Sequence, residues 1–140
     1  MRLFLDANVL VSVLNKEYPL FTYSSRILSL ASNRSKYQVY ISPICLAITF
    51  YFAEKKHGRQ LAKQKIDLLC HHILIVTNLK DGVTKTLHNK KIHDFEDGLE
   101  YYAAKESNCD CIITEDTSDF YFSEIEVVDC KEFFNRYLLN

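Results

Sequence analysis

The stretch Leu3-Phe4-Leu5-Asp6-Ala7-Asn8-Val9-Leu10 opens the chain with a short apolar run that ends at an acid. About a hundred residues later the pattern returns in Ile112-Ile113-Thr114-Glu115-Asp116-Thr117-Ser118-Asp119-Phe120. Both apolar runs are too short for helices, so each predicts a buried strand that is followed by carboxylates. In an open α/β sheet, ligands bind outside the carboxyl ends of the parallel strands. Acids from distant segments at that edge are typical of a site for a divalent cation.

Short apolar strands alternate with helical segments along the chain, which predicts an α/β fold. The expected strands cover residues 2–5, 39–41, 73–77, 111–114 and 126–128. The expected helices cover residues 8–14, 22–33, 44–56, 59–69, 81–89, 94–107 and 131–138. This alternation favours a three-layer α/β/α arrangement around a central, mostly parallel five-stranded sheet. With no repeat or linker, residues 1–140 are expected to form a single domain.

The composition argues against several classes of protein. Nearly half of the residues (48%) are hydrophobic, so disorder is not expected. The longest uncharged stretch, residues 37–53, carries Ser, Thr, Gln and Pro, and we interpret it as a strand and a buried helix, with no membrane association. Asp6 interrupts the first apolar run, so we expect no secretion signal. Five cysteines without a CxxC pair favour a reducing cytoplasm over a disulfide framework.

The net charge of −1 hides an uneven distribution. Residues 94–132 contain thirteen Asp or Glu against two Lys. An acid-free basic stretch contains Lys55, Lys56, Arg59, Lys63 and Lys65. An acidic region beside basic segments suits a metal site next to a groove for a polyanion. For the basic stretch alone, a solvated helix face remains the favoured alternative.

Each candidate acid also has a structural interpretation. Asp6 can cap the turn that follows it, but an unpaired acid at the end of a buried strand is costly, which favours a metal or catalytic role. Asp94 and Asp97 begin a helix, where an N-cap and the helix dipole explain acids equally well. Asp116 and Asp119 lie in a polar loop in which Asx turns also use acids. Local sequence leaves these alternatives open.

Other catalytic chemistries lack their motifs. The chain has no GxGxxG or GxxxxGK[ST] segment for phosphate binding and no GxSxG nucleophile elbow. Hydrolases that form an aspartyl-phosphate also place an Asp after the first strand. Their motif has a second Asp two positions later, where this chain has Asn8.

Taken together, the acidic segments resemble those of the PIN domain, the nuclease fold of many bacterial toxins in toxin–antitoxin pairs. Leu5-Asp6-Ala7-Asn8-Val9-Leu10 resembles the opening Asp-x-Asn segment of the family. Residues 93–104 resemble its central acidic helix, with Asp97 at the metal-binding position, and residues 112–120 resemble its late strand and loop. The resemblance extends over essentially the whole chain.

The resemblance implies a metal-dependent endoribonuclease that hydrolyses phosphodiester bonds of RNA. It implies Mg²⁺ or Mn²⁺ as cofactor, a homodimer, and a small antitoxin as partner. The expected catalytic and metal-binding residues are Asp6, Asp97, Asp116 and Asp119, with Asp94 as a further candidate metal ligand. Asn8 and Thr114 are the candidates for orienting these ligands.

One position departs from the family pattern. The family usually has a Glu after the second strand, in a segment such as Ile41-Ser42-Pro43-Ile44-Cys45-Leu46-Ala47-x, and here that position is Ile48. Glu54 lies about 9 Å further along the helix and on another side, so we do not expect it to substitute. Three alternatives remain: a one-metal site, a site in which water or Asp94 fills the gap, or a catalytically weakened or inactive module that binds RNA or protein.

Overall fold

A computed structural model describes residues 1–139. Its centre is a five-stranded sheet with the strand order β3-β2-β1-β4-β5, in which every neighbouring pair is parallel. The strands are β1 (Arg2–Leu5), β2 (Gln38–Ile41), β3 (Leu74–Ile75), β4 (Cys111–Ile113) and β5 (Glu126–Val128). The expected α/β class is therefore confirmed, and the sheet is wholly rather than mostly parallel.

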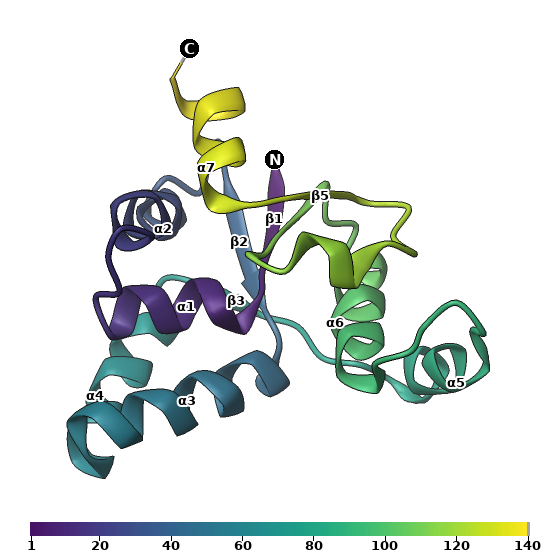
Figure 1. The fold of residues 1–140 in the computed structure, drawn as a ribbon, viewed down its shortest axis with the longest axis horizontal. Coiled ribbons are helices and arrows are strands. Elements are labelled where there is room, and N and C mark those ends of the chain that lie inside the picture. Colours follow the sequence, from purple (N-terminus) through teal and green to yellow (C-terminus); the bar gives the residue numbers. More distant parts are fainter. Residues whose placement is uncertain (140) are drawn as a thin grey trace.

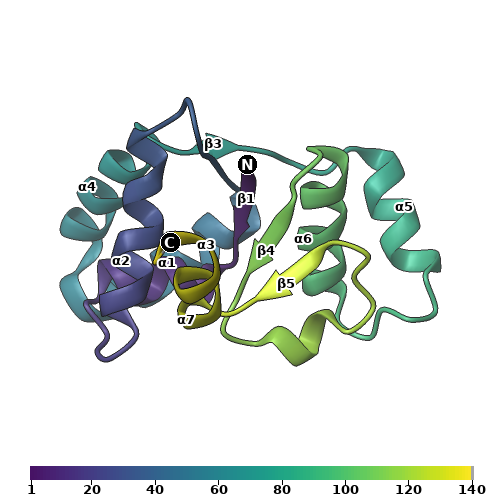
Figure 2. The same cartoon turned by 90° about the horizontal axis from the view of Figure 1, so that it is seen from above.

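Helices cover the sheet from both sides, as parallel strands require. The helices are α1 (Ala7–Leu14), α2 (Phe21–Ser29), α3 (Pro43–His57), α4 (Arg59–Cys70), α5 (Lys80–His88), α6 (Phe95–Glu106) and α7 (Cys130–Phe133). In both views α1 to α4 gather on one side of the molecule, and α5 and α6 lie together on the other (Figures 1 and 2). Within the described residues, no helix has the length and apolar character needed to cross a membrane.

The strand order changes direction next to β1. The chain builds β2 and β3 on one side of β1, then returns to place β4 and β5 on the other. At this reversal the register pairs Leu5 with Ile113, and the Asp6 amide donates to the Ile113 carbonyl at 3.0 Å. The first residues after β1 and β4 therefore lie side by side at the switch point where such sheets bind ligands.

The start and end of α3 follow from local sequence. The Ser42 hydroxyl accepts a hydrogen bond from the Cys45 amide at 3.3 Å, and Pro43 occupies the first helical turn. Gly58, with φ of 84°, ends the helix in a conformation that favours glycine. These boundaries fix which residues of α3 face the carboxyl edge of the sheet, namely Cys45 and, three positions later, Ile48.

Three elements differ from the expected ones. β3 has two residues instead of five, because it pairs only through Leu74 and Ile75 at the edge of the sheet. The helix expected over 22–33 stops at Ser29 and tightens into a 3₁₀ turn over Leu30–Ser32. The last helix widens into a π-helical turn over Phe134–Leu138. All three lie at element ends, where local propensity is weakest.

The core is built around β1 and β4. Leu3, Phe4 and Leu5 of β1 and Ile112 and Ile113 of β4 are fully buried, since helices cover both faces of these central strands. All five cysteines are free thiols. Polar residues follow both strands directly at the carboxyl edge of the sheet, Asp6 after β1 and Thr114 after β4.

Candidate active site

A cleft of about 440 Å³ opens where β1 and β4 end. Its lining comes from Asp6 and the first two turns of α1, the loop after α1, the middle of α3, the first turn of α6 and the loop after β4. The lining residues are Asp6, Ala7, Asn8, Val11, Glu17, Leu20, Ile48, Phe52, Glu96, Asp97, Glu115 and Asp116. The fold thus brings Asp6, Asp97 and Asp116 to one cleft from segments that are distant in sequence.

Asp6 is held from both sides. Its Oδ1 atom accepts a hydrogen bond from the Ala7 amide at 2.6 Å, which caps α1. Its Oδ2 atom accepts one from the Thr114 hydroxyl at 2.7 Å. The residue is 9% exposed, and its position is fixed by β1, α1 and the end of β4 together. Capping and a place in the cleft are therefore compatible for this acid.

Asn8 connects the two strand ends. Its side-chain amide donates toward Asp6 at 3.3 Å, toward Thr114 at 3.2 Å and toward Asp116 at 3.2 Å. Its carbonyl oxygen accepts from the Glu115 amide at 3.2 Å. These bonds fix the loop after β4 against the start of α1, so the Asp6 and Asp116 carboxylates face each other across one amide.

Asp94 and Asp119 lie outside the lining of the cleft. Asp94 is exposed and caps α6 by accepting from the Asp97 amide at 3.0 Å. Asp119 is exposed in the 3₁₀ turn Thr117–Phe120, and its amide donates to the Asp116 carbonyl at 3.0 Å. The charges of both still act on Asp97. The two residues are thus neighbours of the site rather than part of its lining.

The electrostatics of the cleft are unfavourable without a cation. Burial, followed by the charges of Asp94 and Asp6, raises the pKa of Asp97 to about 7. Burial also raises the pKa of Asp6, although the Thr114 hydrogen bond opposes the shift. Among residues 1–139, none of the ion pairs includes Asp6, Asp97 or Asp116. The cleft therefore concentrates negative charge that no basic side chain neutralises.

Glu100 is a buried acid next to Asp6 that our sequence analysis missed, and it lies outside the lining of the cleft. Its side chain is 1% exposed, and its Oε1 atom accepts a bond from the Cys45 thiol at 3.2 Å. Carboxylate oxygens of Glu100 and Asp6 and the Cys45 sulfur lie within 4.8 Å of one another. Burial, followed by the charge of Asp6, raises the pKa of Glu100 to about 10. Its three-residue spacing from Asp97 on the same helix is the sequence signal that could have revealed it.

These residues fit a hard divalent cation. Carboxylate oxygens are the ligands that Mg²⁺ and Mn²⁺ prefer. Within the described part of the chain, the buried Oε2 atom of Glu100 has no hydrogen-bond partner, and a divalent cation would satisfy such an oxygen. Ile48 lines the cleft without offering an oxygen, and Glu54 is paired with Arg59 at 3.7 Å. The helix α3 therefore contributes no acid to this cleft.

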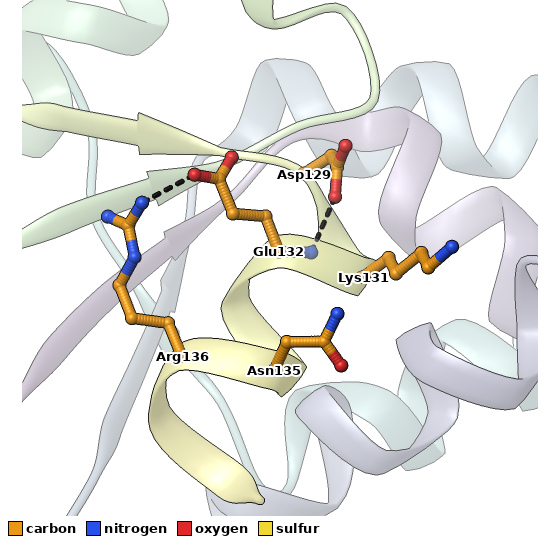
Figure 3. Close-up of a pocket in the computed structure, with 5 residues that line it drawn as sticks. All are labelled: Asp129, Lys131, Glu132, Asn135 and Arg136. Carbon is orange, nitrogen blue, oxygen red and sulfur yellow. Dashed lines mark hydrogen bonds and ion pairs between the residues drawn. The ribbon is translucent and has the colours of Figure 1, made fainter.

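A second recess, of about 410 Å³, lies over α7 and has a different character (Figure 3). Its lining consists of Asp129, Lys131, Glu132, Asn135 and Arg136. Glu132 forms an ion pair with Arg136, and Asp129 accepts from the Glu132 amide at 2.7 Å (Figure 3). Because these acids already have partners, we assign the recess to the solvated face of a capped helix.

Comparisons with known proteins agree with this geometry. The sequence model described as "PIN domain" matches residues 2–118. A curated relative, "Ribonuclease VapC1" of Aquifex aeolicus (strain VF5), is 28% identical over 140 residues, with 97% of this chain and 95% of the relative covered.

Solved structures with similar folds have low sequence identity to this chain. VapBC2 from Rickettsia felis, bound to a DNA fragment from its promoter, gives a TM-score of 0.70 at 20% identity, covering 92% of this chain and 98% of the matched one. VapBC-1 from nontypeable Haemophilus influenzae gives 0.67 at 16%, covering 94% and 99%. VapC20 from Mycobacterium tuberculosis, described as a "Sarcin-Ricin loop cleaving toxin", gives 0.65 at 15%, covering 89% and 98%. At these identities the likeness is one of fold.

Proposed function

The chain belongs to the PIN domain family, and on that basis we propose that it is a metal-dependent endoribonuclease, the toxin of a toxin–antitoxin pair. One observation carries the proposal. Asp6, Asp97 and Asp116 line a single cleft at the switch point of the sheet, although they come from three separate segments. A capping role alone does not require acids from different elements to converge.

We assign metal binding and catalysis to Asp6, Asp97 and Asp116, with Asp119 at the margin of the site. Mg²⁺ or Mn²⁺ bound there would lower the pKa of an attacking water and offset the charge that develops on the phosphoryl and leaving oxygens. Thr114 and Asn8 keep the carboxylates of Asp6 and Asp116 in place through the hydrogen bonds described above. In this assignment Asp94 acts as the cap of α6.

The RNA backbone would approach across the C-terminal end of α3 and the N-terminal end of α4. Phe52 lines the cleft and is 44% exposed, so it offers a ring on which a base can stack. Beyond it, Lys55 and Lys56 lie in the last turn of α3, and Arg59 begins α4. Basic side chains beside an acidic centre attract phosphates without neutralising the acids themselves.

We further propose a small antitoxin, a homodimer and a cytoplasmic location for this chain, with residues 1–140 as one domain. The relative named as a ribonuclease and the neighbours named VapBC support the toxin–antitoxin assignment. Five free thiols suit a reducing compartment.

The test is cleavage of end-labelled single-stranded RNA by the full chain. We expect cleavage in Mn²⁺ or Mg²⁺ and none in a chelator. Loss of a group that supports a metal ligand typically lowers metal affinity or activity by about 10- to 100-fold. Because Asp97 is proposed as a ligand itself, Asp97→Asn should lower the cleavage rate by about a hundredfold or more. Asp67→Asn, the same change at an exposed acid of α4, should cleave like the unmodified protein.

A different result would favour a non-catalytic module. A gel shift with RNA, without cleavage in Mn²⁺ and unchanged by Asp6→Asn, would contradict the nuclease proposal. Testing for a non-catalytic module is informative here because α3 presents Ile48 to the cleft and so contributes no acid.

A further inference from the structure

Glu100 is a buried acid that the proposed assignment leaves without a role. It lies on α6 three residues after Asp97, so the two side chains leave the same side of the helix. Its side chain is almost fully buried, and its Oε1 atom is bonded to the Cys45 thiol at 3.2 Å. Over residues 1–139 its Oε2 atom has no hydrogen-bond partner. A buried carboxylate oxygen without a donor is costly, so Glu100 takes up either a proton, which it can share with Asp6, or a cation.

The position of Glu100 relative to Asp6 suits a shared cation. Their carboxylate oxygens lie within 4.8 Å of each other, in a group that also contains the Cys45 sulfur. Two oxygens that each bind one ion at about 2.1 Å can be at most about 4.2 Å apart. A small adjustment of either side chain therefore brings both oxygens within reach of one ion.

The α3 wall of the same cleft offers no competing acid. Ile48 and Phe52 face the cleft from this helix, and the helix's one acid, Glu54, is paired with Arg59 at 3.7 Å. What α3 does contribute is Cys45, whose thiol donates to Glu100. Acids on α6 are therefore placed to supply what α3 does not.

We infer that Glu100, which lies on α6, is a ligand of the divalent cation and takes the place of the acid that α3 lacks at Ile48. The Cys45 thiol orients the Glu100 carboxylate. The inference rests on the proposed metal site of Asp6 and Asp97. A thiol is a soft ligand, whereas Mg²⁺ and Mn²⁺ prefer oxygen, so Cys45 serves as a hydrogen-bond donor and Glu100 binds the ion.

The experiment measures Mn²⁺ affinity by calorimetry and the Mn²⁺-induced rise in melting temperature on the full chain. Glu100→Gln keeps the shape of the side chain and removes the charge. We expect it to weaken Mn²⁺ binding by about tenfold or more and to lose most of the thermal gain. Glu106→Gln, the same change at an exposed position of α6, should behave like the unmodified protein.

A rescue variant separates a missing ligand from a damaged site. Because Ile48 faces the cleft, Ile48→Glu in the Glu100→Gln background places a carboxylate there again. We expect Mn²⁺ affinity to return toward the original value. If Mn²⁺ affinity stays low in the double variant, the inference is overturned, because Glu100→Gln would then act by disturbing the structure of the site.

The outcomes also separate this inference from the proposed function. If Asp97→Asn abolishes the Mn²⁺ response and Glu100→Gln leaves it intact, Glu100 is a structural acid and only the inference fails. If the unmodified protein itself shows no Mn²⁺ response, the metal site fails and the inference fails with it. If circular dichroism shows that Glu100→Gln does not fold, Glu100→Asp is the deciding variant, because it moves the carboxylate back by one methylene. An unchanged Mn²⁺ affinity of Glu100→Asp would overturn the inference.

Discussion

The Thr114 hydroxyl donates to the Asp6 carboxylate at 2.7 Å, which joins the carboxyl ends of two neighbouring strands at the switch point of the sheet. The Thr114 hydroxyl oxygen also accepts a hydrogen bond from the Asp116 amide at 3.1 Å. One side chain therefore fixes both an acid after β1 and the loop that carries an acid after β4.

Thr114→Val should destabilise the protein. The change keeps the shape of the buried side chain but removes a donor to Asp6 and an acceptor for the Asp116 amide, which should cost about 1–3 kcal/mol of unfolding free energy. Urea denaturation measures it. Thr84→Val, at an exposed position of α5, is the matched control and should stay within about 0.5 kcal/mol. Equal losses in both variants would contradict the role given to Thr114.

The protein in a chelator should lose stability as the pH rises. Burial and the charge of Asp6 raise the pKa of Glu100 to about 10, far above its value in the unfolded chain. The folded state then holds a proton that the unfolded state releases, so this contribution is complete at acidic pH and is lost toward pH 10. Melting temperatures from pH 6 to 9 should fall, and Glu100→Gln should flatten the slope. A slope that is unchanged in Glu100→Gln would show that another group causes it.

Asp94→Asn and Asp94→Ala should have different effects. Asn caps a helix as well as Asp does, whereas Ala loses the bond to the Asp97 amide and should cost about 1 kcal/mol. Urea denaturation distinguishes the two variants. If Asp94 only caps α6, Asp94→Asn should keep most of the Mn²⁺ affinity; a loss as large as that of Asp97→Asn would make Asp94 a ligand.

Gly98→Ala should destabilise the contact between α5 and α6. An added Cβ would lie 2.5 Å from Thr86 Cγ2 and 2.8 Å from Ile92 Cγ2, so the two helices must separate. We expect a cost of about 1–3 kcal/mol, reduced by the better helix propensity of Ala. Gly82→Ala is the control: its nearest neighbour is the end of the flexible Glu106 side chain, so the effect should be small. Similar melting temperatures of Gly98→Ala and Gly82→Ala would contradict the expected difference.

Much of the fold follows from local sequence. Short apolar runs such as Leu3-Phe4-Leu5 predict strands because a buried strand needs few residues and tolerates no charge. Ser42 and Asp94 mark helix starts correctly, since a side-chain oxygen that bonds to an amide three residues later is a local interaction. Element ends such as β3 are predicted less well, because pairing with a neighbour decides them.

The candidate site depends on more than local sequence. Asp6 and Thr114 can be placed at the ends of strands from the sequence, because an apolar run that stops at a polar residue marks the carboxyl end of a buried strand. Which acids share a cleft cannot be read in the same way. Asp94 and Asp97 have similar sequence contexts, yet only Asp97 lines the cleft. Glu100 was missed because its burial depends on how α6 packs beside α3.

The amino-acid sequence by itself determined the α/β class and the acids that end β1 and follow β4, because hydrophobic periodicity and capping act over a few residues. Tertiary structure decided the membership of the site: which carboxylates meet, which remain exposed and which become buried. The physical reason is that the pKa and the solvation of a carboxyl group depend on atoms contributed by other elements, here Cys45 and Asp6 around Glu100.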